Sequence, residues 1–137
     1  MPAISWSDIY LTGIPDIDRD HEKIFSLVNK LHDSFEAGSA DDEVDTAIIQ
    51  LVDYVNDHFA REESLLASIH YINLKPHATA HTSLTAQMNS YAENYKTNPE
   101  TFDMDDFIGF LVKWLQTHIL IEDMAYLNSV RQLTIRV

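Results

Sequence analysis

The sequence predicts an all-α protein: a four-helix bundle with up-down-up-down topology and an N-terminal arm across one end. Three observations indicate this fold. Apolar residues recur every three or four positions in four long stretches, turn residues separate these stretches, and glycine is rare, at 3 of 137 residues. Because 45% of the residues are hydrophobic, a chain of this length can bury a core of its own. We therefore expect a single domain over residues 1–137.

The arm is expected over residues 1–15, where Gly13 and Pro15 interrupt any helix. The first helix is predicted over residues 18–37. Its start is rich in aspartate, and carboxylates there complement the positive end of the helix dipole. Gly38 follows its last residue, as is common at helix ends.

The second helix is predicted over residues 41–68, which carry the clearest amphipathic pattern in the chain. The third is expected over residues 76–96, since proline suits a first helical turn, and the fourth over residues 103–128. Residues 129–137 contain no turn signal, so they form either a tail or an extension of the last helix. The short connections favour antiparallel neighbours.

Composition excludes several classes of function. The formal net charge is −13, with 9 Lys and Arg against 22 Asp and Glu, which argues against nucleic-acid binding. No cysteine is present, so thiolate zinc sites, iron–sulfur clusters and cysteine nucleophiles are excluded. No apolar run approaches the roughly 20 residues that span a bilayer. The N-terminal residues do not resemble a signal peptide, and we expect a cytoplasmic protein without membrane contact.

Each predicted helix carries histidine on its apolar stripe: His21, His58, His77, His81 and His118. One histidine in a core is usually structural, held by hydrogen bonds. A buried imidazole needs a partner for each ring nitrogen, because an unpaired polar group is costly to bury. Five imidazoles in one core therefore indicate a shared partner, and a metal ion provides one.

Spacing strengthens the metal hypothesis. His58 and Glu62 are four residues apart, and so are His77 and His81, which places each pair on one helix face one turn apart. Glu62 belongs to an otherwise apolar stripe, where an unpartnered carboxylate would destabilise the bundle. Glu63 points about 100° away and is expected to face solvent.

The ligand types restrict the choice of metal. Five histidines and two carboxylates are too many for one tetrahedral zinc ion, and Ca²⁺ and Mg²⁺ prefer oxygen ligands. Imidazole suits iron, copper and zinc, while bridging carboxylates suit pairs of ions. Ferritin-like di-iron proteins use Glu-x-x-His motifs. None occurs here, so that class fits poorly.

These motifs make the chain resemble the hemerythrin family, specifically its bacterial single-domain members. The resemblance extends from Trp6 to about Asp123. It is carried by Asp18-x-x-His21, His58-Phe59-x-x-Glu62-Glu63, His77-x-x-x-His81 and Trp114-Leu115-x-x-His118-Ile119-x-x-x-Asp123.

The resemblance implies two iron ions. One would be held by His77, His81 and His118, and the other by His21 and His58. Glu62, Asp123 and an oxo or hydroxo group would bridge them. The ion with two histidines then keeps one open position, where the family binds O2. The resemblance also places Leu115 in the O2 pocket. Phe25, Phe59 and Trp114 are further candidates for its wall, although ordinary core packing is the more common reason for any one of them.

Spacing and resemblance disagree about the second carboxylate. From His118, an ideal helix places Glu122, four residues on, on the same face, whereas Asp123 lies about 140° further round. Following the resemblance, we predict Asp123 as the ligand and a π-bulge near residues 118–123.

We expect reversible O2 binding, for storage, delivery or sensing, and no enzymatic role. Two alternatives stay open: a di-iron enzyme of the peroxidase or nitric-oxide reductase type using the same open position, and a metal-free interaction bundle with core histidines. Metal content separates the last from the others. Turnover of an added reductant separates the enzyme from the O2 carrier.

Overall fold

The computed structural model describes residues 3–127 and 130, and all regular secondary structure within them is helical. The elements are the 3-10 helix η1 (Asp8–Tyr10), the α-helices α1 (Pro15–Glu36), α2 (Asp41–Ser68), α3 (Leu74–Thr97) and α4 (Met104–Thr117), and the π-helical segment η2 (His118–Asp123). Helical structure continues from η2 through residues 124–127. The expected tail or extension at 129–137 lies outside the described residues, except for Val130.

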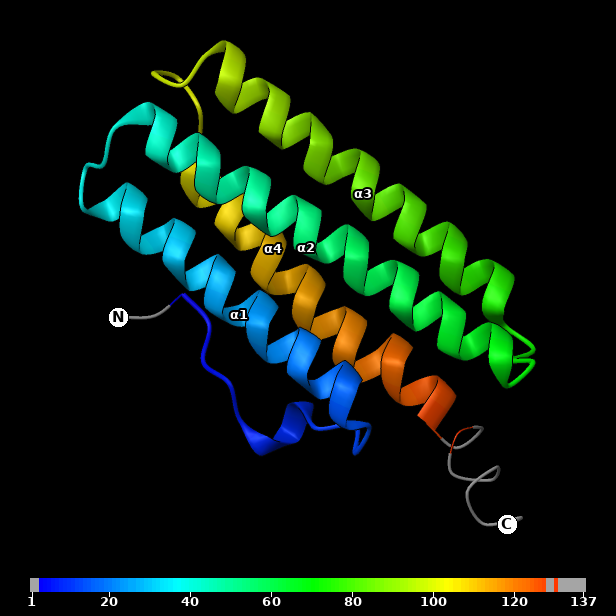
Figure 1. The fold of residues 1–137 in the computed structure, drawn as a ribbon. Coiled ribbons are helices and arrows are strands. Elements are labelled where there is room, and N and C mark those ends of the chain that lie inside the picture. Colours follow the sequence, from blue (N-terminus) through cyan, green and yellow to red (C-terminus); the bar gives the residue numbers. More distant parts are fainter. Residues whose placement is uncertain (1–2, 128–129, 131–137) are drawn as a thin grey trace.

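The four long helices lie side by side and are joined end to end by short connections, so each runs opposite to the one before it (Figure 1). The predicted all-α, up-down-up-down bundle is thus confirmed. The connection after α1 turns at Gly38, whose φ of +71° is a conformation that glycine adopts without strain.

Two helices begin earlier than the sequence predicted. Helix α1 starts at Pro15 instead of residue 18, and α3 starts at Leu74 instead of residue 76. Proline is accommodated in a first turn because its missing N–H has no intrahelical partner there. As a result Asp18 lies inside α1, and its carboxylate accepts hydrogen bonds from Thr12 N and Oγ1, both at 2.8 Å, which ties down the chain leading into the helix.

The N-terminal arm lies along the flank of α1, which corrects the expected position across one end of the bundle (Figure 1). The Asn29 side chain, in the second half of α1, accepts a hydrogen bond from Ile4 N at 3.1 Å and donates one to Ile4 O at 2.8 Å. Further along the arm, Trp6 and Tyr10 pack edge-on against Phe25. The arm follows the helix because its buried apolar side chains and its backbone both find partners along α1.

One half of the bundle core is apolar, and the other half also contains buried polar side chains. His21 lies near the start of α1, His58 in the later half of α2, His77 near the start of α3, and His118 directly after α4. Because successive helices run in opposite directions, all of these positions lie toward the same end of the bundle. Fully buried aliphatic side chains such as Leu31 and Ile48 fill the other half.

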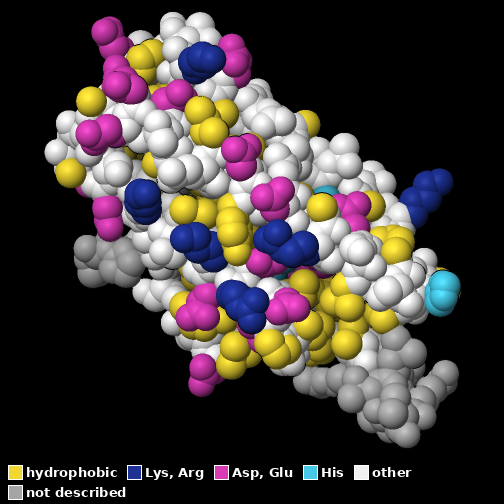
Figure 2. All heavy atoms as spheres, viewed as in Figure 1, with side chains coloured by type: hydrophobic (Ala, Val, Ile, Leu, Met, Phe, Trp, Pro, Cys, Tyr) yellow, Lys and Arg dark blue, Asp and Glu magenta, His cyan; other side chains and the backbone are white. Residues whose placement is uncertain are grey.

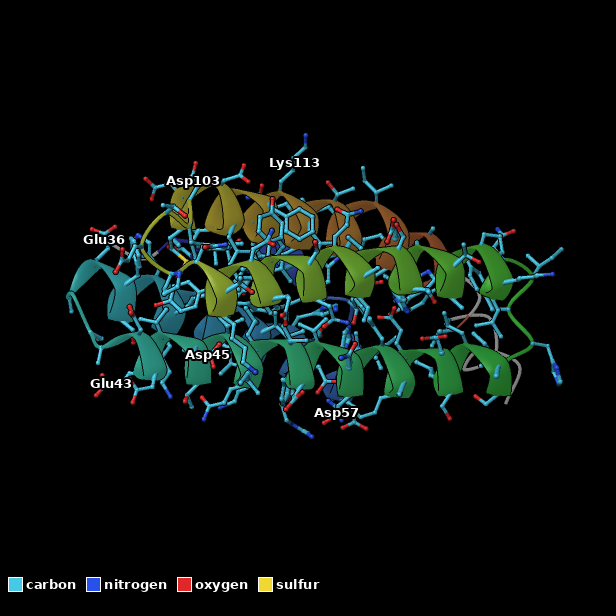
Figure 3. The ribbon with its side chains drawn as sticks, turned by 90° about the horizontal axis from the view of Figure 1, so that it is seen from above. Glu36, Glu43, Asp45, Asp57, Asp103 and Lys113 are labelled. Carbon is cyan, nitrogen blue, oxygen red and sulfur yellow. The ribbon has the colours of Figure 1, made fainter. Side chains whose placement is uncertain are left out.

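Charged residues cover the outside. Figure 3 shows Glu36, Glu43, Asp57, Asp103 and Lys113 on the periphery of the bundle, with side chains directed away from the core. On the face in Figure 2, the Lys and Arg side chains lie among acidic ones. Among the described residues, no helix combines the length and apolar character that crossing a bilayer requires.

Candidate metal centre

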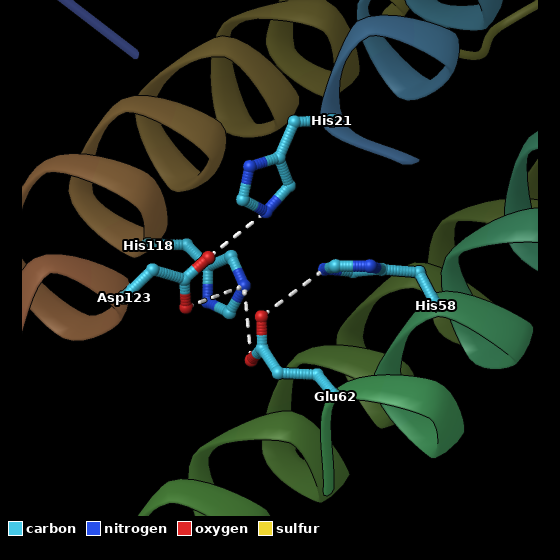
Figure 4. Close-up of side chains that lie close together, drawn as sticks. All are labelled: His21, His58, Glu62, His118 and Asp123. Atoms are coloured by element: carbon cyan, nitrogen blue, oxygen red, sulfur yellow. Dashed lines mark ion pairs between the residues drawn. The ribbon is translucent and has the colours of Figure 1, made fainter. Parts of the chain in front are cut away.

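The structure brings the seven predicted ligand residues together in the core. They form two overlapping groups. His21, His58, Glu62, His118 and Asp123 make up one, and Glu62, His77, His81 and His118 the other; in each group the potential ligand atoms lie within 4.8 Å of one another. All seven residues are buried. Figure 4 shows the first group, with both carboxylates between the imidazoles.

The two oxygens of Glu62 face different histidines. Oε1 lies 2.5 Å from His77 Nε2 and 3.1 Å from His81 Nε2. Oε2 lies 3.5 Å from His58 Nε2. The carboxylate therefore stands between the histidines of α3 and a histidine of α2.

Asp123 divides its oxygens in the same way. Oδ1 lies 3.3 Å from His118 Nε2 and 3.8 Å from His77 Nε2. Oδ2 lies 2.9 Å from His21 Nε2. Together, the two carboxylates sort the five imidazoles into a set of three (His77, His81 and His118) and a set of two (His21 and His58). His118 also approaches the set of two, with its ring centroid 6.0 Å from those of His21 and His58.

Several polar atoms in this cluster are buried without a hydrogen-bond partner among the described residues. They are the Nε2 atoms of His21, His58, His81 and His118, the Nδ1 atom of His21, and both carboxylate oxygens of Asp123. Most buried polar groups are satisfied, so their concentration at one place indicates a missing common partner. Imidazole nitrogens and carboxylate oxygens are ligands for iron, copper or zinc. The residues thus fit a pair of such ions.

The two carboxylates have opposite electrostatic environments. Burial alone would raise the pKa of Glu62, but the adjacent imidazoles of His77 and His81, and the nearby His118 and His58, lower it well below its usual value. For Asp123, burial and the neighbouring Glu62 charge both raise the pKa well above its usual value. Two adjacent buried carboxylates repel each other, and cations between them would remove that repulsion.

Burial also acts on the imidazoles. Desolvation lowers the pKa of His21 well below its usual value, and the nearby His58 and His118 lower it further. Desolvation likewise lowers the pKa of His118, against the raising effect of the hydrogen bond with Glu122. Neutral imidazole is the form that binds metal ions.

Three further carboxylates contact the outward ring nitrogens of the cluster. His58 Nδ1 lies 3.0 Å from Asp20 Oδ2, His81 Nδ1 lies 3.2 Å from Glu63 Oε2, and His118 Nδ1 lies 3.0 Å from Glu122 Oε2. Such contacts fix the ring orientation of metal-binding histidines.

Sequence reasoning missed the roles of these outer carboxylates. The expectation that Glu63 faces solvent is corrected, because its side chain is partly buried and its carboxylate contacts His81. In the sequence, Asp20 is one of the aspartates at the start of the first predicted helix, and nothing there pairs it with a particular histidine. Its position immediately before a predicted ligand, His21, was the available signal, although its partner lies 38 residues away.

The predicted π-bulge is confirmed: residues His118–Asp123 form a π-helix. Bonding from each residue to the fifth along widens the turn, so residues five apart come to share a face. Asp123 therefore points into the cluster with His118, while Glu122 turns to the outer nitrogen of the same imidazole.

The four predicted O2-pocket residues are all buried, but they differ in what they touch. Phe59 stacks on His81 with a centroid distance of 3.8 Å, and Trp114 stacks on His118 at 5.7 Å. Phe25 packs against the arm residues Trp6 and Tyr10. Leu115 is fully buried in the same apolar core.

Comparison with known proteins gives a consistent result. The model of the hemerythrin HHE cation-binding domain matches residues 12–130. The bacteriohemerythrin of Pseudomonas aeruginosa is 31% identical over 131 residues, which cover 96% of this chain and 84% of that protein. The bacteriohemerythrin of Clostridium acetobutylicum is 33% identical, covering 90% of this chain and 98% of that protein. A crystal structure of a hemerythrin mutant superposes with a TM-score of 0.85 at 27% identity, covering 94% of this chain and 98% of the other.

Proposed function

The chain belongs to the hemerythrin family, and from this premise we propose that it binds O2 reversibly at two iron ions held by the buried cluster. One ion would be bound by the set of three histidines, His77, His81 and His118. The other would be bound by the set of two, His21 and His58. Glu62, Asp123 and an oxo or hydroxo group would bridge the ions.

The observation that supports this assignment best is the orientation of the two carboxylates. Each presents one oxygen to the set of three histidines and the other to the set of two. With three bridging groups, the set of three would fill six positions around its ion, whereas the set of two would leave one position open. When bound, the iron pair supplies O2 with that position and with electrons.

The surrounding residues favour binding over irreversible oxidation. The proposed ligand set is rich in neutral imidazole and contains two carboxylates, so it offers little negative charge to stabilise high-valent iron. Phe59 and Trp114 stack on His81 and His118, and Leu115 is buried in the same apolar core, so apolar side chains cover one side of the cluster and would limit access of water and soluble reductants to it. We propose storage, delivery or sensing of O2 in the cytoplasm as the role of the protein.

The test is a spectroscopic titration of the purified protein, preceded by iron analysis. We expect about two iron ions per chain, the number this ligand set accommodates. We further expect an absorption change on adding O2 to the reduced protein that reverses when O2 is removed. Steady consumption of an added reductant would favour the enzyme instead, and absence of bound metal would favour a metal-free bundle.

A further inference from the structure

The three outer carboxylates are held very differently. Among the described residues, Glu63 and Glu122 each bond one imidazole, and their side chains are 35% and 34% exposed. Asp20 is 8% exposed and accepts four hydrogen bonds. These come from His58 Nδ1 at 3.0 Å, Arg61 Nε at 2.9 Å, Arg61 Nη2 at 2.9 Å and the Tyr54 hydroxyl at 2.9 Å.

We propose that Arg61, supported by Tyr54, is a positioning residue that fixes Asp20 and thereby sets the orientation and electron donation of His58. This inference rests on the proposed function, in which His58 binds the ion with the open position. Arg61 itself touches no member of the proposed ligand set through a hydrogen bond among the described residues.

The geometry favours a rigid arrangement. The guanidinium contacts both oxygens of Asp20, Oδ2 through Nε and Oδ1 through Nη2, and such bidentate pairs fix direction as well as distance. Tyr54 bonds Oδ1, and its ring lies 5.4 Å from the Arg61 guanidinium carbon. Tyr54, His58 and Arg61 follow one another at spacings of four and three along α2, so one helix face surrounds a carboxylate supplied by α1.

This arrangement matters most for the ion with two histidines. The other histidine of that set, His21, has a buried Nδ1 without a hydrogen-bond partner among the described residues. His58 is therefore the one imidazole of the pair whose outer nitrogen is held. On the side with three histidines, two outer carboxylates share this task.

Arg61 also limits how far Asp20 increases the basicity of the His58 imidazole. A carboxylate that accepts the outer N–H of a ligand histidine makes that histidine more basic. Two hydrogen bonds from a guanidinium withdraw negative charge from Asp20 and weaken this effect. Without Arg61, His58 becomes a stronger electron donor, which favours the ferric over the ferrous ion. Without the Asp20 charge, His58 becomes a weaker donor, which favours the ferrous over the ferric ion.

The test compares three variants of the full chain: Arg61→Met, Asp20→Asn and Arg19→Gln. Arg61→Met keeps a long, half-exposed side chain but removes the guanidinium that bonds both oxygens of Asp20. Asp20→Asn keeps the shape of the side chain but removes its negative charge. Arg19→Gln is the matched control, since it removes a positive charge next to Asp20 in the sequence. The Arg19 side chain is 72% exposed and pairs with Asp16. The measurements are the anaerobic Fe(II) dissociation constant, the reduction potential of the loaded protein, and thermal unfolding.

We expect Arg61→Met to lower the reduction potential, and Asp20→Asn to raise it. Both should weaken Fe(II) binding by about ten-fold or more, the usual result of losing an outer partner of a ligand. Arg19→Gln should match the wild type. A merely structural role for Arg61 would shift the potential of both variants in the same direction.

The inference is overturned if Arg61→Met has the wild-type potential and Fe(II) affinity, if Arg61→Met and Asp20→Asn shift the potential in the same direction, or if Arg19→Gln reproduces the effect of Arg61→Met. The variants test this inference once the wild-type protein is shown to hold iron and to bind O2. A wild-type protein that holds no iron refutes the proposed function itself, so the two failures are distinguishable.

Discussion

His118 and Asp123 are five residues apart and point to the same place, with His118 Nε2 3.3 Å from Asp123 Oδ1. In an ideal α-helix they would be separated by about 140° around the axis. The π-helical turn over His118–Asp123 removes this separation and turns Glu122 toward the outer nitrogen of His118. One local change in helix geometry thus gives two adjacent carboxylates different tasks.

This relationship predicts different effects for the two acidic residues. Asp123→Ala should abolish binding of the iron pair, because it removes one of the two bridging carboxylates. Glu122→Ala should retain both ions and weaken their affinity by about 10- to 100-fold, as an outer partner does. Iron content per chain, measured after desalting, separates the two variants. Full iron content in Asp123→Ala would show that the bridge is assigned to the wrong residue.

The metal-free protein should lose stability as pH rises because of Asp123. Burial and the nearby Glu62 raise the folded pKa of Asp123 well above its ordinary value of 3.8, so the folded state holds this proton more tightly than the unfolded state. The contribution is complete below 3.8 and falls as pH rises through the raised folded pKa. Urea unfolding across this range is the measurement, with Asp123→Asn as comparison. An equally steep decline in Asp123→Asn would contradict the assignment.

Removing the Tyr126 hydroxyl should destabilise the metal-free protein. This buried hydroxyl donates to Glu62 Oε2 at 3.2 Å. Loss of a hydrogen bond to a charged group costs about 1.5–3 kcal/mol, so Tyr126→Phe should lower the free energy of unfolding by that amount. Tyr95→Phe serves as the matched control, since its hydroxyl bonds the exposed Asp41 at 3.2 Å outside the cluster. Equal losses in both variants would count against a special role for the Glu62 contact.

The apolar half of the bundle should determine stability without affecting the iron site. Ile48 is fully buried and lies ten residues before His58, about 15 Å along α2. Ile48→Ala should lower the free energy of unfolding by about 2–5 kcal/mol through the cavity it leaves. Its neighbour Ile49 is 49% exposed, and Ile49→Ala should change stability by no more than about 0.5 kcal/mol. Chemical denaturation and iron analysis test both points, and loss of iron in folded Ile48→Ala would contradict the separation of the two halves.

The fold and most of the inner residues of the cluster could be predicted from the sequence, because both depend on spacing within single helices. Apolar residues at intervals of three and four define the helices, and His58 with Glu62, or His77 with His81, share a face within one turn. Short connections then bring these faces to one end of the bundle. Spacing alone favours Glu122 over Asp123 as the second carboxylate ligand, and only the resemblance to the family predicts Asp123.

The outer contacts and the arm were decided only by tertiary structure. The pairing of Asp20 with His58 and Arg61 joins residues about 40 positions apart, and it depends on the axial offset between α1 and α2. Likewise, Ile4 meets Asn29 because the arm folds back along a helix face. Periodicity within a helix determines which face a side chain occupies. The contact it makes there depends on the relative position of two packed helices, which becomes defined only when the whole core packs.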